Sequence, residues 1–200
     1  MHMLFFIAYI NNHIKEYMKP KLIIINGPPA IGKSTIAQKY VDNHPMALKL
    51  DIDELWFMLG QWQSSRPASN MQKMKLAYVM AGMHLQDGYD VIVAQHLDNL
   101  SYYKVFESIA RACGATMYEV LLIAPLQEAI ERCKERGRVS GYPSGFRPGG
   151  ILESEGRESK LALMHKVSSD VCAKRPNMHT IHSEQGSVAA TYEKLLLAIS

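Results

Sequence analysis

The chain alternates short apolar runs with longer amphipathic stretches from residue 22 to its end. The apolar runs stop at polar or turn-forming residues, which is typical of strands buried on both faces of a parallel sheet. Strands are predicted at 22–26, 46–53, 90–94, 116–124 and 178–182. Helices are predicted at 34–41, 54–59, 70–87, 101–113, 125–136, 155–174 and 188–199. This order predicts an α/β fold of three layers, with a five-stranded parallel sheet and ligands at the carboxyl ends of the strands.

Two segments fall outside this alternation. We interpret residues 1–17 as an extension before a single domain at 18–200. The apolar run of that extension, at 3–10, is too short to span a bilayer, and it lacks the basic start and cleavage site of a signal peptide. The stretch GRVSGYPSGFRPGG at 137–150 is rich in glycine and proline and is predicted to be a loop.

Composition narrows the classes of function. The 200 residues are 48% hydrophobic, which suits one globular core, and no membrane partner is expected. The formal net charge is only +3, without the dense Lys/Arg block of a nucleic-acid-binding arm. The three cysteines are odd in number and lack a CxxC pair, so we expect no disulfide framework and a cytoplasmic protein, either monomeric or homodimeric.

The strongest chemical signal is the segment IINGPPAIGKST, residues 24–35, between the first strand and the first helix. It matches GxxxxGK[ST] in the strand–turn–helix context that this phosphate-binding motif requires. Glycines let the backbone approach phosphates, and the N–H groups at the helix start favour anions. Lys33 would reach the β- and γ-phosphates of ATP, and the Ser34 hydroxyl would bind Mg²⁺. The nucleotide-binding residues are predicted to be Gly27, Pro28, Pro29, Ala30, Ile31, Gly32, Lys33, Ser34 and Thr35.

Two aspartates follow the second predicted strand, in LDIDEL. Residues two apart in an extended segment share a face, so Asp51 and Asp53 are expected to point to one region. If that strand neighbours the first one, this region lies beside the phosphate loop. One carboxylate, Asp51, could support Mg²⁺, while Asp53 could accept the proton of an attacking hydroxyl. Alternatively, Asp53 only caps the short helix at 54–59.

Arginines surround the glycine-rich loop. Arg132 and Arg136 are four residues apart and share a helix face, and Arg138 and Arg147 follow them. Guanidinium groups stabilise the charge that spreads over a phosphoryl group during transfer, so we predict catalytic roles for Arg132 and Arg136 and nucleotide binding for Arg138. The alternative is a solvated helix end, where Glu128 pairs with Arg132.

Aromatic residues gather after the second strand, where an acceptor would bind. Trp56 and Trp62 could stack on a sugar or planar ring, and Arg66 lies in the same loop, at 60–70. Phe57 is expected to be helix core instead. The methionines at 71, 74, 80 and 83 recur at helical spacing, which favours core packing over a substrate surface.

Taken together, the phosphate loop, Asp53 in DIDEL and the segment ERCKERGR at 131–138 resemble the small P-loop kinases with the nucleoside-monophosphate-kinase fold. Within them, the chain is similar to the chloramphenicol phosphotransferase, zeta-toxin and tunicamycin-resistance type of ATP-binding protein. The resemblance implies a lid at about 137–150, ATP as donor, Asp53 as the base, and SEQGS at 183–187 near the adenine. The Asp51/Asp53 pair is also similar to the Asp-x-Asp of shikimate kinases.

The third predicted strand departs from this family pattern. Kinases of this type often carry an acid at its end, where this chain has Gln95 and His96. The metal would then depend on Asp51 or Asp53. Gln95 and His96 would face the cleft and read the substrate, unless His96 only caps a turn.

Three hypotheses of function follow. The first is an ATP- and Mg²⁺-dependent kinase that phosphorylates a hydroxyl of a small molecule such as an antibiotic, nucleotide sugar or metabolite. The second is a polynucleotide 5′-hydroxyl kinase, for which the 60–70 loop offers only Arg66 as a basic residue. The third is a nucleotide-binding switch protein that hydrolyses ATP slowly and acts through a partner.

Overall fold

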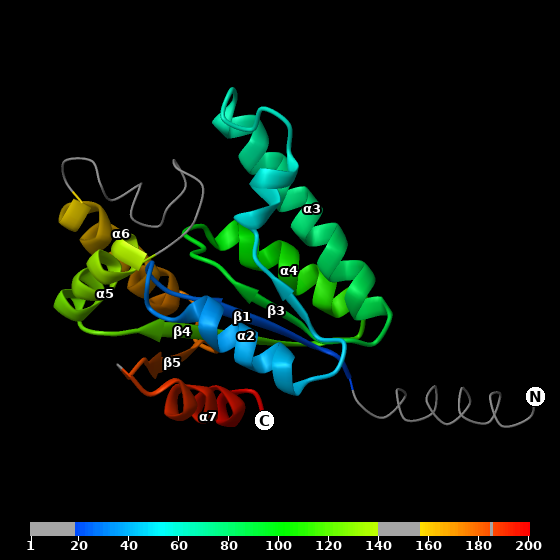
Figure 1. Ribbon diagram of the computed structural model, residues 1–200. Coiled ribbons are helices and arrows are strands. Elements are labelled where there is room, and N and C mark those ends of the chain that lie inside the picture. The colour runs from blue at the N-terminus through cyan, green and yellow to red at the C-terminus, as the bar shows by residue number, and fades with distance from the viewer. Residues whose placement is uncertain (1–18, 140–156, 185) are drawn as a thin grey trace, which may run out of the picture.

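The computed structural model describes residues 19–139, 157–184 and 186–200, with only the helical backbone described for 136–139 and residue 157. Five parallel strands form one sheet in the order β2 (Leu48–Leu50), β3 (Val91–Ala94), β1 (Lys21–Asn26), β4 (Thr116–Ile123) and β5 (His179–His182) (Figure 1). The predicted α/β class and the five-stranded parallel sheet are confirmed. Residues 1–17, predicted to be an extension, and 140–150, most of the predicted lid, lie outside the described residues.

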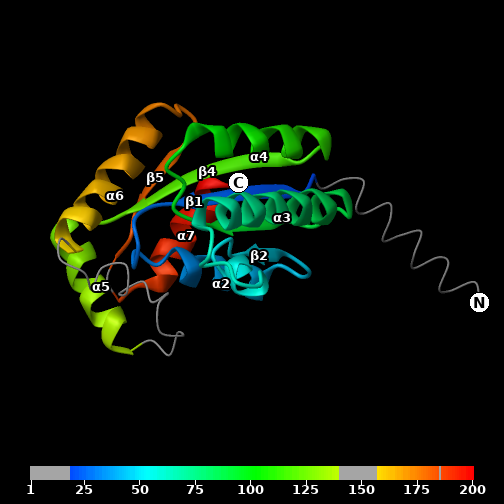
Figure 2. The ribbon, with the colours of Figure 1, turned by 90° about the horizontal axis from the view of Figure 1, so that it is seen from above.

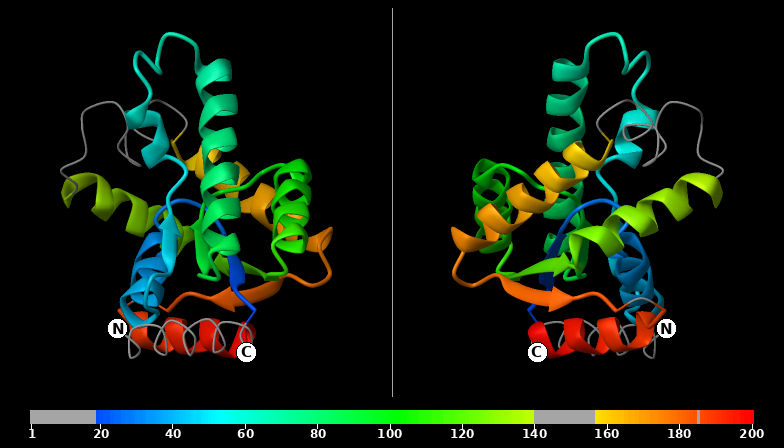
Figure 3. Two further views of the ribbon diagram at one scale, coloured as in Figure 1. Left: turned by 90° about the vertical axis from the view of Figure 1, so that its right-hand side faces the viewer. Right: turned by 90° about the vertical axis from the view of Figure 1, so that its left-hand side faces the viewer.

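Helices cover both faces of the sheet because the strands are apolar on both faces. Along β1, Ile23 and Ile25 join one core cluster, whereas Leu22 and Ile24 join the other. The first cluster is covered by α2 (Lys33–Asn43), α5 (Leu126–Val139) and α7 (Val188–Ala198), and Leu161 near the start of the sixth helix also joins it. The second is covered by α3 (Arg66–Gln86), α4 (Leu100–Ala112) and α6 (Arg157–Ala173). Figure 2 and Figure 3 show α4 and α7 on opposite sides of the sheet.

The second strand is shorter than predicted and lies elsewhere in the sheet. It ends at Leu50, so Asp51 and Asp53 belong to a turn before the 3₁₀ helix η1 (Glu54–Met58), not to an extended segment. It pairs with β3, which separates it from β1. The condition under which the aspartates would lie directly beside the phosphate loop, that β2 neighbours β1, is therefore not met, and the end of β3 lies between the ends of these two strands.

Helix boundaries differ where turn chemistry was misjudged. Helix α3 begins at Arg66, four residues earlier than predicted, since Pro67 fits a first helical turn. Helix α4 is capped by Asn99, whose side chain accepts a hydrogen bond from the Ser101 N–H at 2.9 Å. No helix in the described part of the chain is long and apolar enough to cross a membrane.

The helix-core predictions for α3 and η1 are partly wrong. Of the four methionines on α3, only Met74 is buried, while the others are exposed. In η1, Phe57 was expected to be buried, but it is 38% exposed. Its neighbour Trp56 is buried instead, at 7% exposed.

Candidate active site

The phosphate loop connects β1 to α2 at the carboxyl edge of the sheet. Gly27 has a φ of 149° and Gly32 a φ of 100°, conformations in which a side chain is strained. A Cβ on Gly27 would also overlap the carbonyl oxygen of Leu122 on β4. Both motif glycines are therefore required by the backbone, and the loop has the shape of a phosphate cradle.

The start of α2 suits an anion. Its N-cap, Gly32, makes no side-chain capping bond, and no acidic residue stands in the first turn. The helix dipole and its first N–H groups therefore favour negative charge at Lys33, Ser34 and Thr35. The Lys33 ammonium closes the loop, donating to the carbonyl oxygens of Gly27 at 2.9 Å and Pro28 at 2.8 Å.

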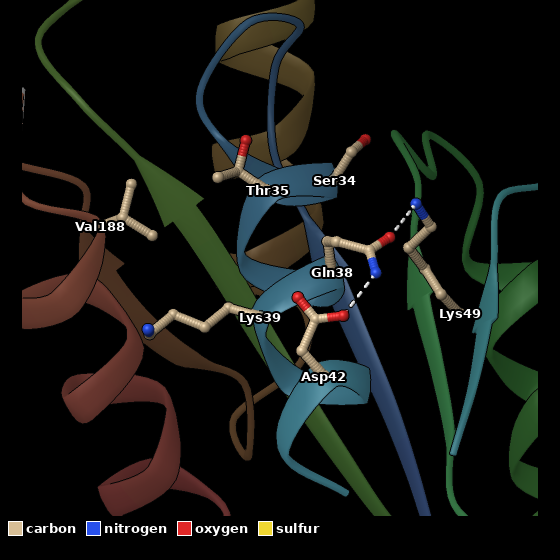
Figure 4. A pocket seen from close by; sticks show the side chains of 7 residues that line it. All are labelled: Ser34, Thr35, Gln38, Lys39, Asp42, Lys49 and Val188. Atoms are coloured by element: carbon tan, nitrogen blue, oxygen red, sulfur yellow. Dashed lines mark hydrogen bonds between the residues drawn. The ribbon is translucent and has the colours of Figure 1, made fainter. Parts of the chain in front are cut away.

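Ser34 and Thr35 lie at one end of an open groove of about 500 Å³ (Figure 4). Along the groove, the Gln38 amide donates to Asp42 at 2.8 Å and accepts from Lys49 at 2.7 Å. These bonds connect the helix that carries Ser34 to β2, the strand that ends just before Asp51.

A cavity of about 210 Å³ lies on the other side of the phosphate loop. The phosphate loop, α2, α5, α7 and the segment after β5 all contribute to its wall. The lining residues are Ala30, Ile31, Gly32, Thr35, Ile36, Arg132, Glu135, Ser183, Glu184, Gly186, Val188 and Thr191. The segment 183–187, for which the family resemblance implies a place near the adenine, thus borders a cavity next to the loop.

Arg132 is fixed in the wall of this cavity. Its guanidinium donates to the Ser183 hydroxyl at 2.8 Å and to the Ser183 carbonyl at 3.3 Å, and it pairs with Glu128. The buried Nε finds no hydrogen-bond partner among the described residues. Arg132 therefore lines the cavity beside the phosphate loop, and although it pairs with Glu128 as the alternative expected, its side chain is only 13% exposed and is not at a solvated helix end.

The other predicted arginines cannot be placed with their side chains. Arg136 and Arg138 lie in α5, but their side chains are outside the described residues, as is all of Arg147. That Arg132 and Arg136 share one face of the helix therefore stays a prediction.

Asp53 does not cap η1, although it occupies the capping position. Its Oδ1 accepts a hydrogen bond from the Lys73 ammonium of α3 at 2.6 Å. The side chain of Lys73 is 9% exposed, whereas that of Asp53 is 39% exposed. The capping alternative is wrong, and the structure instead presents a half-exposed carboxylate held by a buried cation.

Lys73 was missed by sequence reasoning. Burial lowers the pKa of its ammonium, and the neighbouring charge of Asp53 opposes this effect. Its Nζ also lies 3.1 Å from the centroid of the Trp56 ring, a cation–π contact. The sequence did contain a signal for this residue. Lys73 belongs to a row of buried α3 positions spaced four residues apart, whose other members are Ser69, Ala77 and Ala81.

Asp51 lies close to Asp53. Its Oδ1 accepts a hydrogen bond from the Asp53 N–H at 3.2 Å. Burial and then the charge of Asp53 raise the pKa of the Asp51 carboxyl, so a cation placed there would be stabilised. No group of three or more His, Cys, Asp or Glu side chains that could hold a metal ion occurs in the described ranges. The Asp51 carboxylate and the Ser34 hydroxyl are oxygen ligands of the kind that would suit Mg²⁺, which uses few protein ligands and keeps waters and phosphate oxygens.

The aromatic residues gather as the sequence predicts. Trp56 and Trp62 stack with ring centroids 5.5 Å apart. The guanidinium of Arg66 lies 4.8 Å from the Trp62 ring and 5.6 Å from the Trp56 ring. Trp56 contacts the Lys73 ammonium, which in turn donates to Asp53, so the aromatic cluster is connected to Asp53.

Gln95 and His96 follow β3, between the loop and the aspartates. The Gln95 N–H donates to the Ile25 carbonyl at 3.1 Å and continues the pairing with β1. The Nδ1 of the His96 ring lies 3.2 Å from the Ser168 hydroxyl of α6, and burial and then the Lys33 ammonium of the phosphate loop lower the pKa of this ring. His96 therefore stands near the phosphate loop, and its expected role in reading the acceptor stays a prediction.

Asn26, a second residue that sequence reasoning missed, holds the loop at its first residue. It is fully buried, and its Oδ1 accepts from the N–H groups of Gly27 at 2.7 Å and Leu97 at 3.0 Å. Its amide donates to the Leu97 carbonyl at 3.1 Å. One side chain thus joins the ends of β1 and β3.

Replacing Asn26 by alanine is expected to lower the free energy of unfolding by about 2–4 kcal/mol, because two buried N–H groups lose their acceptor. Urea denaturation measures the change. The control is Asn43→Ala, which removes an exposed amide bonded to the Lys39 carbonyl, and we expect its effect to be within about 0.5 kcal/mol. Equal effects of the two substitutions would contradict the role of Asn26.

Comparisons with known proteins agree with this geometry. A family model for the AAA domain matches residues 22–147, which include the phosphate loop, the aspartates and all of α5. No curated protein sequence matches the chain.

Solved structures share the fold. The Deinococcus radiodurans tunicamycin resistance protein is similar with a TM-score of 0.58 and 14% identity over 90% of this chain and 95% of that chain. The Mycobacterium tuberculosis APS kinase CysC, solved with AMPPNP and APS, gives a TM-score of 0.59 and 18% identity over 90% and 98%. A chain of the Pnkp1/Rnl/Hen1 complex gives 0.52 and 22% over 58% of this chain, which spans only 40% of that one. The fold is that of P-loop kinases, as the family resemblance implied.

Proposed function

We propose that this chain, which belongs to the AAA domain family, is an ATP-dependent phosphotransferase that moves the γ-phosphoryl group to a hydroxyl of a small molecule. One observation carries the proposal. The phosphate loop and the half-exposed carboxylate of Asp53 are both near enough to one histidine, His96, for Lys33 to lower and Asp53 to raise the pKa of its ring. Donor and acceptor groups would meet between them.

Each side chain then has a role. Lys33 binds the β- and γ-phosphates, and Ser34 with Asp51 supports Mg²⁺, which neutralises phosphate charge when bound. Asp53 orients the acceptor hydroxyl and takes its proton as the oxygen attacks phosphorus. Arg132 lines the cavity that would hold the nucleoside.

Arg136 and Arg138 are the remaining donors to phosphate in this proposal. Both stand on the last turns of α5, beyond Arg132. Guanidinium groups there would stabilise the charge of the transferred phosphoryl group.

The acceptor would bind against Trp56, Trp62 and Arg66. A stacked pair of indoles with an adjacent guanidinium suits a ring that carries polar groups. The three cysteines are free, which fits action in the cytoplasm.

A 5′-hydroxyl oligonucleotide is the second candidate acceptor. Trp62 with Arg66 could stack a nucleobase, and the similarity to a chain of the Pnkp1/Rnl/Hen1 complex adds weight. Binding of such an acceptor would weaken steeply with salt concentration, whereas binding of a neutral small molecule would not.

The test is thermal stabilisation by a panel of candidate acceptors, with and without Mg-ATP. The panel contains aminoglycosides, phenicols, nucleosides, UDP-sugars, shikimate, gluconate, adenosine 5′-phosphosulfate and 5′-hydroxyl oligonucleotides. A true acceptor should raise the melting temperature, because it binds only the folded chain. It should then be phosphorylated in the presence of Mg-ATP. Stabilisation by ATP without any productive acceptor would favour the switch protein instead.

Lys73→Met is expected to reduce turnover of that acceptor roughly ten- to a hundredfold, because Asp53 loses the partner that fixes its orientation. Affinity for Mg-ATP should stay unchanged. Lys73→Arg, which keeps the cation beside Asp53 and Trp56, should restore part of the rate. Steady-state kinetics with the acceptor varied measure the effect. Wild-type turnover in Lys73→Met would show that the ion pair is only structural.

A further inference from the structure

Helix α3 is apolar on two faces, of which only one belongs to the core. The core face contributes four buried apolar residues, which are Met74, Ala77, Ala81 and Leu85. A second apolar row, here called the α3 stripe, recurs at helical spacing and consists of Leu76, Val79, Met80 and Met83. Val79 is 59% exposed and Met83 is 64% exposed. A helix that packs on a single core needs one apolar face, so the stripe indicates a further binding surface.

The surroundings of the α3 stripe are those of an interface. The exposed positions that flank it on the helix, Gln72, Lys75 and Gln86, are polar and form a rim. Beyond the end of the helix, the His84 ring hydrogen-bonds the Met46 carbonyl at 2.6 Å, and Met46 itself is 64% exposed. The apolar surface therefore continues from the helix to the residues before β2.

The chain enters the domain near the same end of α3. At the start of β1, the Lys21 N–H donates to the Asp90 carboxylate at 2.7 Å. The neighbour of Asp90 is connected to α3, because the Tyr89 N–H donates to the His84 carbonyl at 3.3 Å. Figure 1 and Figure 2 both show the start of β1 and the end of α3 at one end of the molecule. The segment before residue 19 therefore joins the domain close to the C-terminal end of the α3 stripe.

The length of this segment is sufficient to cover the stripe. From Leu76 to Met83 the helix rises by about 10 Å, at about 1.5 Å per residue. Residues 3–14 would extend over about 17 Å even at this compact rise. Residues 15–20 remain to make the connection to β1.

The sequence of the segment also matches the stripe. Its apolar positions include a row spaced four, three and four residues apart, which is Met3, Ile7, Ile10 and Ile14. The α3 stripe contains the same alternation of four and three, at Leu76, Met80 and Met83. This is the spacing with which one helix packs along another. Because both stretches run toward the start of β1, they would lie parallel, with Ile14 near Met83.

We propose that residues 3–14 of this chain bind along the α3 stripe and cover it from water. The inference goes beyond the proposed function, since it involves neither nucleotide nor acceptor. Contact between the segment and the stripe removes two apolar surfaces from solvent. The segment is joined to the same domain, so its effective concentration at the stripe is high, which favours it over a second copy of the chain.

Hydrogen exchange of the full chain, followed by mass spectrometry, tests this inference. The double variant Val79→Lys/Met83→Lys places two charges on the stripe, at positions exposed enough for the fold to be kept. We expect the backbone amides of residues 3–14 to exchange at least about tenfold faster in this variant than in wild type, because the segment loses its apolar contact. The control is Leu197→Lys, which charges a residue of α7 that is 77% exposed, and it should match wild type.

A reciprocal variant decides the matter if the first one does not fold. Ile7→Lys/Ile10→Lys changes only the segment and leaves the contacts of the described residues intact. Dilute hydrogen peroxide should then oxidise Met83 several times faster than in wild type, because its thioether loses the cover of the segment. Met58, 75% exposed in η1, is the internal reference, and its oxidation rate should stay the same.

Unchanged exchange of residues 3–14 in Val79→Lys/Met83→Lys would overturn the inference, as would unchanged oxidation of Met83 in Ile7→Lys/Ile10→Lys. Exchange measured at several protein concentrations, together with the mass from light scattering, identifies the occupant. Protection of residues 3–14 in a monomer, independent of concentration, supports the inference. Protection that disappears on dilution as a dimer dissociates would overturn it, since the segment would then cover the stripe of a second copy.

Discussion

Gly27→Ala is expected to abolish Mg-ATP binding and to lower the free energy of unfolding by about 3 kcal/mol or more. The added methyl group would overlap the carbonyl oxygen of Leu122, and its residue would have to adopt a φ of 149°. The Leu122 carbonyl cannot move aside easily, because Leu122 pairs with Ile181 of β5 and the preceding residue, Leu121, pairs with Asn26 of β1. The loop must therefore leave its position, and the cradle is lost.

Gly114→Ala is the matched control. Gly114 also has a positive φ, 66°, but no atom within 4 Å of an added Cβ. We expect it to cost about 1–2 kcal/mol, the price of the backbone conformation alone, and to leave nucleotide binding intact. Chemical denaturation and nucleotide titration of both variants distinguish the effect of steric overlap with Leu122 from the effect of the strained backbone conformation. If Gly27→Ala loses no more stability than Gly114→Ala and binds Mg-ATP normally, the close approach to β4 is unimportant.

Asp53→Asn is expected to lower turnover of the acceptor by about 10²–10⁴-fold, the usual contribution of a general base. The amide keeps the size of the side chain but cannot take the proton of the hydroxyl. Mg-ATP affinity should stay within about twofold, because Asp53 does not line the nucleotide cavity. The measurement is steady-state transfer to the acceptor that the stability panel identifies.

Glu54→Gln provides the control for Asp53→Asn. It removes an exposed carboxylate from the next position without touching the Lys73 ion pair. Its turnover should match wild type. Full activity of Asp53→Asn would show that another group takes the proton, and equal losses in both variants would point to the general negative charge of this turn.

Local chemistry explains what sequence could predict. The phosphate loop is contiguous, and each glycine has a conformational reason that a motif records, so its place between β1 and α2 was predictable. The fold class followed from apolar runs long enough to be buried on both faces. The aromatic cluster was also predictable, because its members lie close together in the chain.

Contacts between residues that are far apart in the chain explain what the sequence could not predict. Lys73 reaches Asp53 across 20 residues, and Asn26 reaches Leu97 across 71. Both depend on strand order, and the insertion of β3 between β2 and β1 is a tertiary property that no local pattern reveals. His96 is an example of the same limit, since its neighbour Ser168 lies 72 residues away.

The cavity beside the phosphate loop is built from two stretches of the chain. The loop, α2 and α5 contribute wall residues within the matched family region 22–147, whereas Ser183, Glu184 and Thr191 lie beyond it. If the nucleoside binds in this cavity, as we propose, substitutions at those three positions are expected to change the preference for one nucleoside over another while the backbone of the phosphate loop stays the same.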